Sequence, residues 1–95
     1  MTKIVWDEHK RQANLEKHGF DFADVSDLDW ATALIEEGGL DALGKRRLKA
    51  IGYFHDGTAA VTFMTLGTEA VSIISFRPAS AKERKRLSWP QRQRE

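Results

Sequence analysis

An arginine that ends a predicted strand and leads into a basic helix is the segment best suited to chemistry on an anion. Residues 69–77 are rich in β-branched and aromatic side chains, which favours a strand buried on both sides, and they end at Arg77. Pro78 then stops the strand, because proline has no N–H for a ladder. Ser80 and Glu83 have capping-box spacing, which predicts a helix from about Ala81 with four cations in its first two turns: Lys82, Arg84, Lys85 and Arg86. The pattern predicts an anion-binding site, with RNA phosphate as the natural candidate.

Two more arginines open an earlier strand. Arg46 and Arg47 begin the predicted strand 46–55, two strands before the one that ends at Arg77. In an antiparallel meander the first and third strands run parallel, so we expect Arg47 and Arg77 at opposite ends of the sheet. Their side chains would meet only if a strand were short or strongly twisted.

The first predicted helix carries a polar stripe. Lys10, Asn14 and Lys17 recur at helical spacing and therefore share one side. From the residues alone, a solvated face is the favoured interpretation of such a stripe. His18 ends the helix, where it is a candidate acid or base, because histidine is the residue type suited to proton transfer near neutral pH. Alternatively, it only complements the negative end of the helix dipole.

The elements that position these residues follow from periodicity and turn chemistry. Asp7 as N-cap and Gly19 as C′ residue predict the first helix, after a short strand at residues 4–6 and before a short helix at 21–30. Predicted strands then follow at 31–37, 46–55, 58–66 and 69–77, with a glycine-rich loop at 38–44. The fold class is α+β: a small antiparallel meander with N-terminal helices and a C-terminal basic helix, the helices packed on one face of the sheet.

Composition limits the other possibilities. A chain of 95 residues with 41% hydrophobic and 31% charged residues predicts one globular domain, over residues 1–88, before a polar tail at 89–95 that we expect to be frayed. The absence of cysteine excludes a disulfide framework and fits a reducing cytoplasm. The three histidines lack zinc-ligand spacing, and no apolar run could span a membrane, so no metal, cofactor or membrane is expected.

Charge is unevenly distributed along the chain. Residues 20–43 contain seven acids and no Lys or Arg, whereas residues 77–95 contain seven bases and two acids. This predicts a basic face for nucleic acid and an acidic face turned away from it. The alternative is a domain with one basic, solvated helix.

Two motifs carry a family resemblance. The first is Trp6-Asp7-x-x-Lys10-x-x-x-Asn14-x-x-Lys17-His18-Gly19, followed by Phe22 and Ala23. The second is Ile73-Ile74-Ser75-x-Arg77-x-Ala79 with Glu83-Arg84, preceded by Arg47, Ile51-Gly52 and Thr65. With these motifs the sequence resembles the BrnT family of toxins from type II toxin–antitoxin systems over residues 4–87.

The resemblance implies a RelE-like fold and a metal-independent endoribonuclease that arrests translation. It also implies a cognate, BrnA-like ribbon-helix-helix antitoxin, which blocks the toxin and links it indirectly to operator DNA. We expect this antitoxin to cover the basic face. The stripe of Lys10, Asn14 and Lys17 is then more consistent with RNA binding than with a solvated face. The full set of expected RNA-binding residues is Lys10, Asn14, Lys17, Arg46, Lys82 and Arg84.

The implied reaction is attack of a 2′-hydroxyl on the adjacent phosphate. Arg47 and Arg77 would stabilise the developing charge, and His18 or Glu83 would assist as general acid or base. Glu83 has an alternative role as the capping-box acid. The chain departs from the family pattern at Lys45, usually acidic, and at Leu87, usually aromatic. These departures favour the alternative function, a non-catalytic RNA- or antitoxin-binding module.

Overall fold

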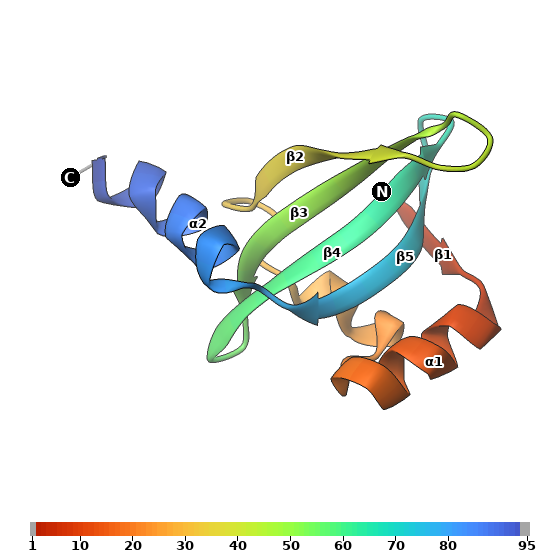
Figure 1. Cartoon of the computed structure of the whole chain (residues 1–95), viewed down its shortest axis with the longest axis horizontal. Helices are drawn as coiled ribbons and strands as arrows, with labels where there is room; N and C mark the ends of the chain where they lie inside the picture. The colour runs from red at the N-terminus through yellow and green to blue at the C-terminus, as the bar shows by residue number, and fades with distance from the viewer. Residues whose placement is uncertain (1, 94–95) are drawn as a thin grey trace.

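Five strands form one mixed sheet in the order β1-β5-β4-β3-β2 (Figure 1). The computed structural model describes residues 2–93, with side chains described as far as Leu87. The strands are β1 (Lys3–Trp6), β2 (Leu34–Leu40), β3 (Arg46–Phe54), β4 (Gly57–Leu66) and β5 (Ala70–Pro78). The helices are α1 (Glu8–His18), the 3₁₀-helix η1 (Phe22–Asp27) and α2 (Ala81–Gln93). The predicted α+β class is therefore confirmed.

The strand pairing is only partly antiparallel. β2, β3, β4 and β5 pair antiparallel in sequence order, whereas β1 pairs in parallel with β5, with Ile4 opposite Val71. β2 runs to Leu40, three residues beyond its predicted end, and shifts register between Glu37 and Gly39. Gly39 has φ 97°, a conformation that glycine adopts without strain.

The helix boundaries follow from their caps. Asp7 accepts hydrogen bonds from the N–H groups of His9 and Lys10, and Gly19 ends α1 in the left-handed conformation with φ 73°. The predicted helix over 21–30 is instead the short 3₁₀-helix η1, capped by Asp21. At the other end of the chain, the α2 backbone is helical to Gln93, past Pro90, where the sequence predicted a frayed tail. Of that tail, residues 94 and 95 lie outside the described residues.

The two faces of the sheet are covered differently. Ala50 and Ile51 are consecutive in β3 and therefore point to opposite faces. Ala50 belongs to the main core, whose buried members are Phe22, Val25, Leu28, Ala50, Ala59, Val61, Phe63, Ile73 and Phe76. We call this side the apolar face. Ile51 belongs to a smaller cluster with Ala79 and Leu87 on the other side.

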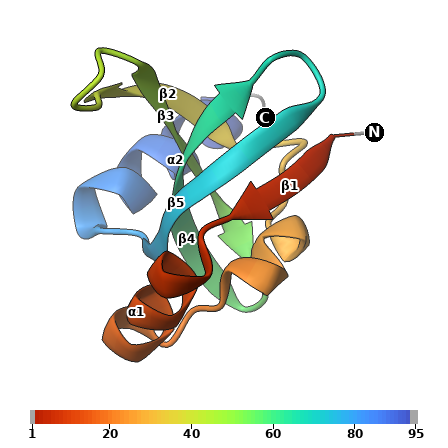
Figure 2. The same cartoon turned by 90° about the vertical axis from the view of Figure 1, so that its right-hand side faces the viewer.

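The prediction that the helices pack on one face of the sheet is wrong. The η1 helix contributes Phe22 and Val25 to the apolar face, while α2 contributes Leu87 to the opposite one. Figure 2 shows α2 on the far side of the strands from η1, with α1 beside the end of β5. The reason is the chain path after β5, which ends at Pro78: Ala79 already packs with Ile51 and Leu87 on the opposite side, and α2 begins two residues later.

A bulge in β5 keeps the core continuous. Thr62 pairs with Ser75, but the next residue of β4, Phe63, pairs with Ile73, which leaves Ile74 as an extra residue. The extra residue lets Ile73 and Phe76 reach the same apolar face although three positions separate them. Among the described helices, none is long and apolar enough to cross a membrane.

Candidate functional site

Three cations share the face of the sheet on which α2 lies. Lys49 and Arg47 lie two and four residues before Ile51 in β3, and side chains alternate along a strand, so all three point to the same side. Arg77 joins them, because it pairs with Ala60, which in turn pairs with Ile51. We call this side the cationic face. Figure 1 shows α2 crossing only one end of it.

A buried carboxylate ties two of these cations to α2. Glu83 is 4% exposed, and its oxygens accept hydrogen bonds from Arg77 Nη1 and Nη2, at 2.8 Å each. Lys49 Nζ lies 2.8 Å from Glu83 Oε2. The Ser80 N–H donates to Glu83 Oε1 at 2.8 Å, while Ser80 Oγ accepts from the Glu83 N–H at 3.2 Å. The predicted capping box is therefore formed, and its carboxylate also orients Arg77 and Lys49. We call these four residues the Glu83 cluster.

The cluster fixes the charge states of its members. The Arg77 guanidinium, followed by Lys49 and the Ser80 N–H, lowers the pKa of Glu83 far below its ordinary value, against the opposing effect of burial. Glu83 in turn raises the pKa of Arg77. Glu83 is therefore ionised near neutral pH and has no proton to donate. Of its two expected roles, this geometry fits the capping-box acid better than the general acid, and the same carboxylate also orients Arg77 and Lys49.

Lys49 was not singled out from the sequence. Its Nζ also lies 3.9 Å from Glu36 of β2, and Glu36 accepts two hydrogen bonds from Arg86 at 2.7 and 3.0 Å. The available signal was its alternation with Arg47 and Ile51 along β3. That pattern identifies a shared face, but it does not identify Glu83, which is 34 residues away in the sequence.

Arg47 lies on the cationic face apart from the cluster. Its Nε atom is buried and has no hydrogen-bond partner among the described residues. Arg77 is level with Ile51 across two strand pairs, so it lies four residues from Arg47 along the strand direction, roughly 13 Å at a strand's rise per residue. The register therefore separates the two arginines, with Lys49 between their levels, and they do not form a close pair.

Asn14 is committed to the fold. It is 8% exposed, and its amide bonds both backbone groups of Phe76: Nδ2 donates to the carbonyl at 2.6 Å, and Oδ1 accepts from the N–H at 3.1 Å. Nδ2 also donates to the Phe20 carbonyl at 3.0 Å. Because β1 ends at Trp6, this amide takes the place of a strand neighbour at the edge of β5. It fixes the residue directly before Arg77.

The remaining polar residues of α1 lie away from these contacts. Lys10 and Lys17 are exposed, while His18 is half-buried. Among the described residues, no hydrogen bond or ion pair joins His18 to the Glu83 cluster. The described part of the chain also contains no group of three or more His, Cys, Asp or Glu residues arranged to hold a metal ion.

Comparison with known proteins identifies the family. A family model described as the ribonuclease toxin BrnT of type II toxin–antitoxin systems matches residues 6–83. The chain belongs to the BrnT family. It is also similar to the crystal structure of the Brucella abortus ribonuclease toxin BrnT, with 43% sequence identity and a TM-score of 0.65, over 84% of this chain and 99% of that chain. Comparison with curated proteins found no match.

The match to the BrnT family ends at the anchoring carboxylate, Glu83. It therefore includes the whole Glu83 cluster and leaves most of α2 outside. Leu87, one of the two departures noted above, is 2% exposed and fills the small core between α2 and the sheet. The other departure, Lys45, is exposed in the turn before β3.

Two other predicted RNA-binding residues are not part of the cationic face. Arg46 alternates with Arg47 and therefore lies on the side of the apolar face, 3.7 Å from Glu37 and largely exposed. Arg84 donates from Nη1 to the Ala79 carbonyl at 3.0 Å, which holds it against the start of α2. Lys82 is exposed on α2, one residue from the Glu83 cluster.

Proposed function

We propose that this BrnT-family chain is a metal-independent endoribonuclease that inhibits translation and is neutralised by a ribbon-helix-helix antitoxin. The RelE-like character expected from the sequence is part of this proposal. The observation that carries it is the Glu83 cluster, in which a buried, ionised carboxylate orients Arg77 and Lys49 on a face that α2 leaves largely uncovered. Fixed cations on an accessible face are suited to a phosphate whose charge grows during reaction.

The proposed reaction needs no hydrolytic water in its first step. The 2′-oxygen attacks the adjacent phosphorus, the bond from phosphorus to the 5′-oxygen breaks, and a 2′,3′-cyclic phosphate remains. A base takes the proton of the 2′-hydroxyl, and an acid supplies one to the departing 5′-oxygen. Arg77 and Arg47 lie on either side of the level of Lys49, so a phosphate placed at that level would have its transition-state charge stabilised by all three side chains. Each well-placed donor contributes about 10²–10³-fold to the rate.

Proton transfer is assigned outside the Glu83 cluster. Glu83 serves as a positioning residue, because its lowered pKa makes it a poor acid and a weak base. His18 is the proposed acid or base, with an expected contribution of about 10²–10⁴-fold. The exposed Lys10 and Lys17 on the same helix contact flanking RNA phosphates in this scheme.

One observation favours the alternative function, a non-catalytic binding module. Glu83 accepts hydrogen bonds from both terminal nitrogens of Arg77. The Glu83 cluster also offers no evident general acid for the departing 5′-oxygen. Binding of RNA without cleavage would use the same cations.

The deciding experiment treats naked, structured RNA with purified, antitoxin-free protein in the presence of a chelator. We expect products with cyclic phosphate ends, lost by at least 10²-fold in Arg77→Ala and Arg47→Ala. Arg46→Ala is the matched control, because it removes an adjacent arginine of β3 from the opposite side, and cleavage should persist. Circular dichroism checks that each variant is folded.

The other outcomes are equally informative. RNA that is bound but stays intact would support the non-catalytic module. Cleavage that survives both Arg77→Ala and Arg47→Ala would place the site elsewhere. For the antitoxin, we expect competition with RNA for the cationic face. Simultaneous binding of antitoxin and RNA, without loss of affinity for either, would contradict that expectation.

A further inference from the structure

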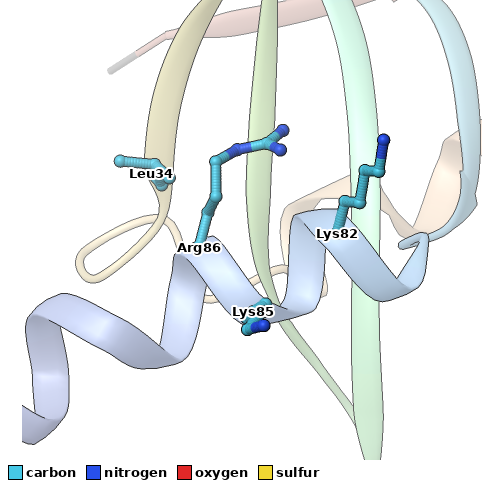
Figure 3. Close-up of a pocket in the computed structure, with 4 residues that line it drawn as sticks. All are labelled: Leu34, Lys82, Lys85 and Arg86. Atoms are coloured by element: carbon cyan, nitrogen blue, oxygen red, sulfur yellow. The ribbon is translucent and has the colours of Figure 1, made fainter.

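A groove runs between α2 and the neighbouring edge of the sheet. Its lining residues are Leu34 of β2 and Lys82, Lys85 and Arg86 of α2, and its volume is about 560 Å³. Figure 3 shows Lys82 and Arg86 reaching from the helix over the strands, with Leu34 beside Arg86. We call it the α2–β2 groove.

The groove combines an apolar wall with two lysines that have no carboxylate partner among the described residues. Leu34 is half-buried and packs against the small core that contains Ile51 and Leu87. Arg86 is held in place by its two hydrogen bonds to Glu36. Lys82 and Lys85 are exposed, and no carboxylate partner for either occurs among the described residues. The site thus offers a fixed guanidinium plane, an aliphatic surface and two free ammonium groups.

The groove is continuous with the proposed catalytic face. Glu36 contacts both Arg86 and Lys49, and Lys49 contacts Glu83, which holds Arg77. One chain of charged contacts therefore links the groove to the Glu83 cluster. Lys82, which lines the groove, also directly precedes Glu83 in α2, so an RNA whose phosphate lies at Arg77 and Lys49 would extend toward the groove.

We propose that the α2–β2 groove binds the nucleotide next to the cleaved linkage in single-stranded RNA. The base lies on Leu34 and the Arg86 guanidinium, and Lys82 and Lys85 bind its phosphate. Bases stack on guanidinium planes and apolar side chains, whereas phosphates bind free ammonium groups. This inference rests on the proposed function and extends it from one phosphate to a flanking nucleotide.

RNA fits the groove better than an acidic peptide segment of a partner. An acidic peptide would be attracted to the same cations. RNA, however, also accounts for the apolar wall next to them and for the continuity with the Glu83 cluster. The competing occupant is tested directly below.

The test measures how cleavage depends on substrate length. Fluorescent RNA oligonucleotides of increasing length, starting from a dinucleotide, are compared by kcat/KM. We expect kcat/KM to rise on the order of 10- to 100-fold once a flanking nucleotide reaches the groove. The double variant Lys82→Ala/Lys85→Ala and the single variant Leu34→Ala should each lose most of this gain. The control Lys3→Ala/Lys45→Ala removes two exposed lysines that do not line the groove and should retain it.

A second measurement keeps the inference testable without catalysis. The dissociation constants of 2′-O-methyl oligonucleotides of the same lengths are measured by fluorescence anisotropy, with hexaglutamate as competitor. Affinity that rises with length, falls in the groove variants and resists hexaglutamate supports the groove even if no RNA is cleaved. Equal length dependence in all variants would overturn it, and so would displacement by hexaglutamate as effective as by RNA. Thermal melts confirm that Leu34→Ala is folded.

Discussion

The two faces of the sheet have opposite compositions although the same strands build both. Among the described residues, the apolar face buries nine hydrophobic side chains, two of which come from η1. The cationic face carries Arg47, Lys49 and Arg77, and α2 covers only one end of it. Burying apolar area is the main source of stability, whereas oriented charge on an accessible surface is suited to binding anions. The comparison separates the side of the sheet that buries most of the apolar area from the side of the proposed ribonuclease site.

The largest expected effect is on the apolar face. Phe22 is fully buried, so Phe22→Ala should lower the free energy of unfolding by about 3–5 kcal/mol. Urea denaturation measures the change. RNA affinity, corrected for the folded fraction, should stay within about twofold, well under the 1.4 kcal/mol that a tenfold change represents. A loss of RNA affinity greater than tenfold would show that the two faces are coupled.

Glu83 is the residue beside the cationic face whose substitution should also lower the free energy of unfolding. Glu83→Gln leaves Arg77 and Lys49 without their counter-ion, and we expect a loss of about 2–3 kcal/mol at pH 7. This is less than for a fully buried pair, because both cations are partly solvated. Guanidinium denaturation of wild type and variant measures it. A loss below 0.5 kcal/mol, the size typical of a surface substitution, would mean that the cluster does not persist in solution.

The same substitution predicts a pH signature. The pKa of Glu83 is lower in the folded protein than the ordinary value of about 4.3 in the unfolded chain. Its contribution is therefore complete above that ordinary value and is lost as the pH falls toward the folded pKa. Wild-type stability should fall below about pH 5, and Glu83→Gln should fall less steeply. The stability of Glu83→Gln should still fall somewhat with pH, because two other carboxyl groups have lowered pKa values. The pKa of Glu8 is lowered to about 2, and that of Asp21 is also lowered.

Arg47 should separate activity from stability. Its buried Nε lacks a partner among the described residues, so Arg47→Met removes an unsatisfied donor while keeping an aliphatic stem. We expect the free energy of unfolding to stay constant or rise by up to about 1 kcal/mol, and RNA cleavage to fall about 10²-fold. Thermal melts measure the change in stability, and cleavage assays measure the change in the rate of RNA cleavage. A destabilisation above that size would indicate that Nε is bonded in solution.

The smallest effect is expected for the ion pair between Arg86 of α2 and Glu36 of β2. Arg86 is 43% and Glu36 27% exposed, so a double-mutant cycle with Arg86→Ala and Glu36→Ala should give a coupling of about 0.2–1 kcal/mol. The coupling should weaken in 1 M salt, where charges are strongly screened. A larger, salt-insensitive value would place this pair in the protein interior.

Local patterns predicted most of the elements. Alternating side chains and turn chemistry identified β3 and β4, and the Asp7 and Gly19 caps identified α1. Pairing over long separations carries no such local signal. The parallel pairing of β1 with β5 joins the two ends of the sheet's sequence, with Ile4 opposite Val71. The position of α2 on the opposite face depends on the chain path after Pro78.

The candidate site was predictable only in part. Arg47, Arg77 and Glu83 stood out by type and position, and the capping box gave Glu83 its partner, Ser80. Lys49 was missed because only tertiary packing brings it to Glu83. Asn14 was assigned to RNA, since a stripe of polar residues on a helix does not reveal which member turns inward. Its three hydrogen bonds to backbone groups became visible only with the fold.

The pairing of β1 with β5 sets an order for synthesis. Lys3 lies opposite Ala70, so the first strand leaves the ribosome long before its only neighbour in the sheet exists. Until the last strand follows, a nascent chain holds an unpaired edge and lacks the segment that carries Arg77. The sheet and the Glu83 cluster are completed almost together, so the proposed ribonuclease site is absent from any nascent chain that has not yet reached Glu83.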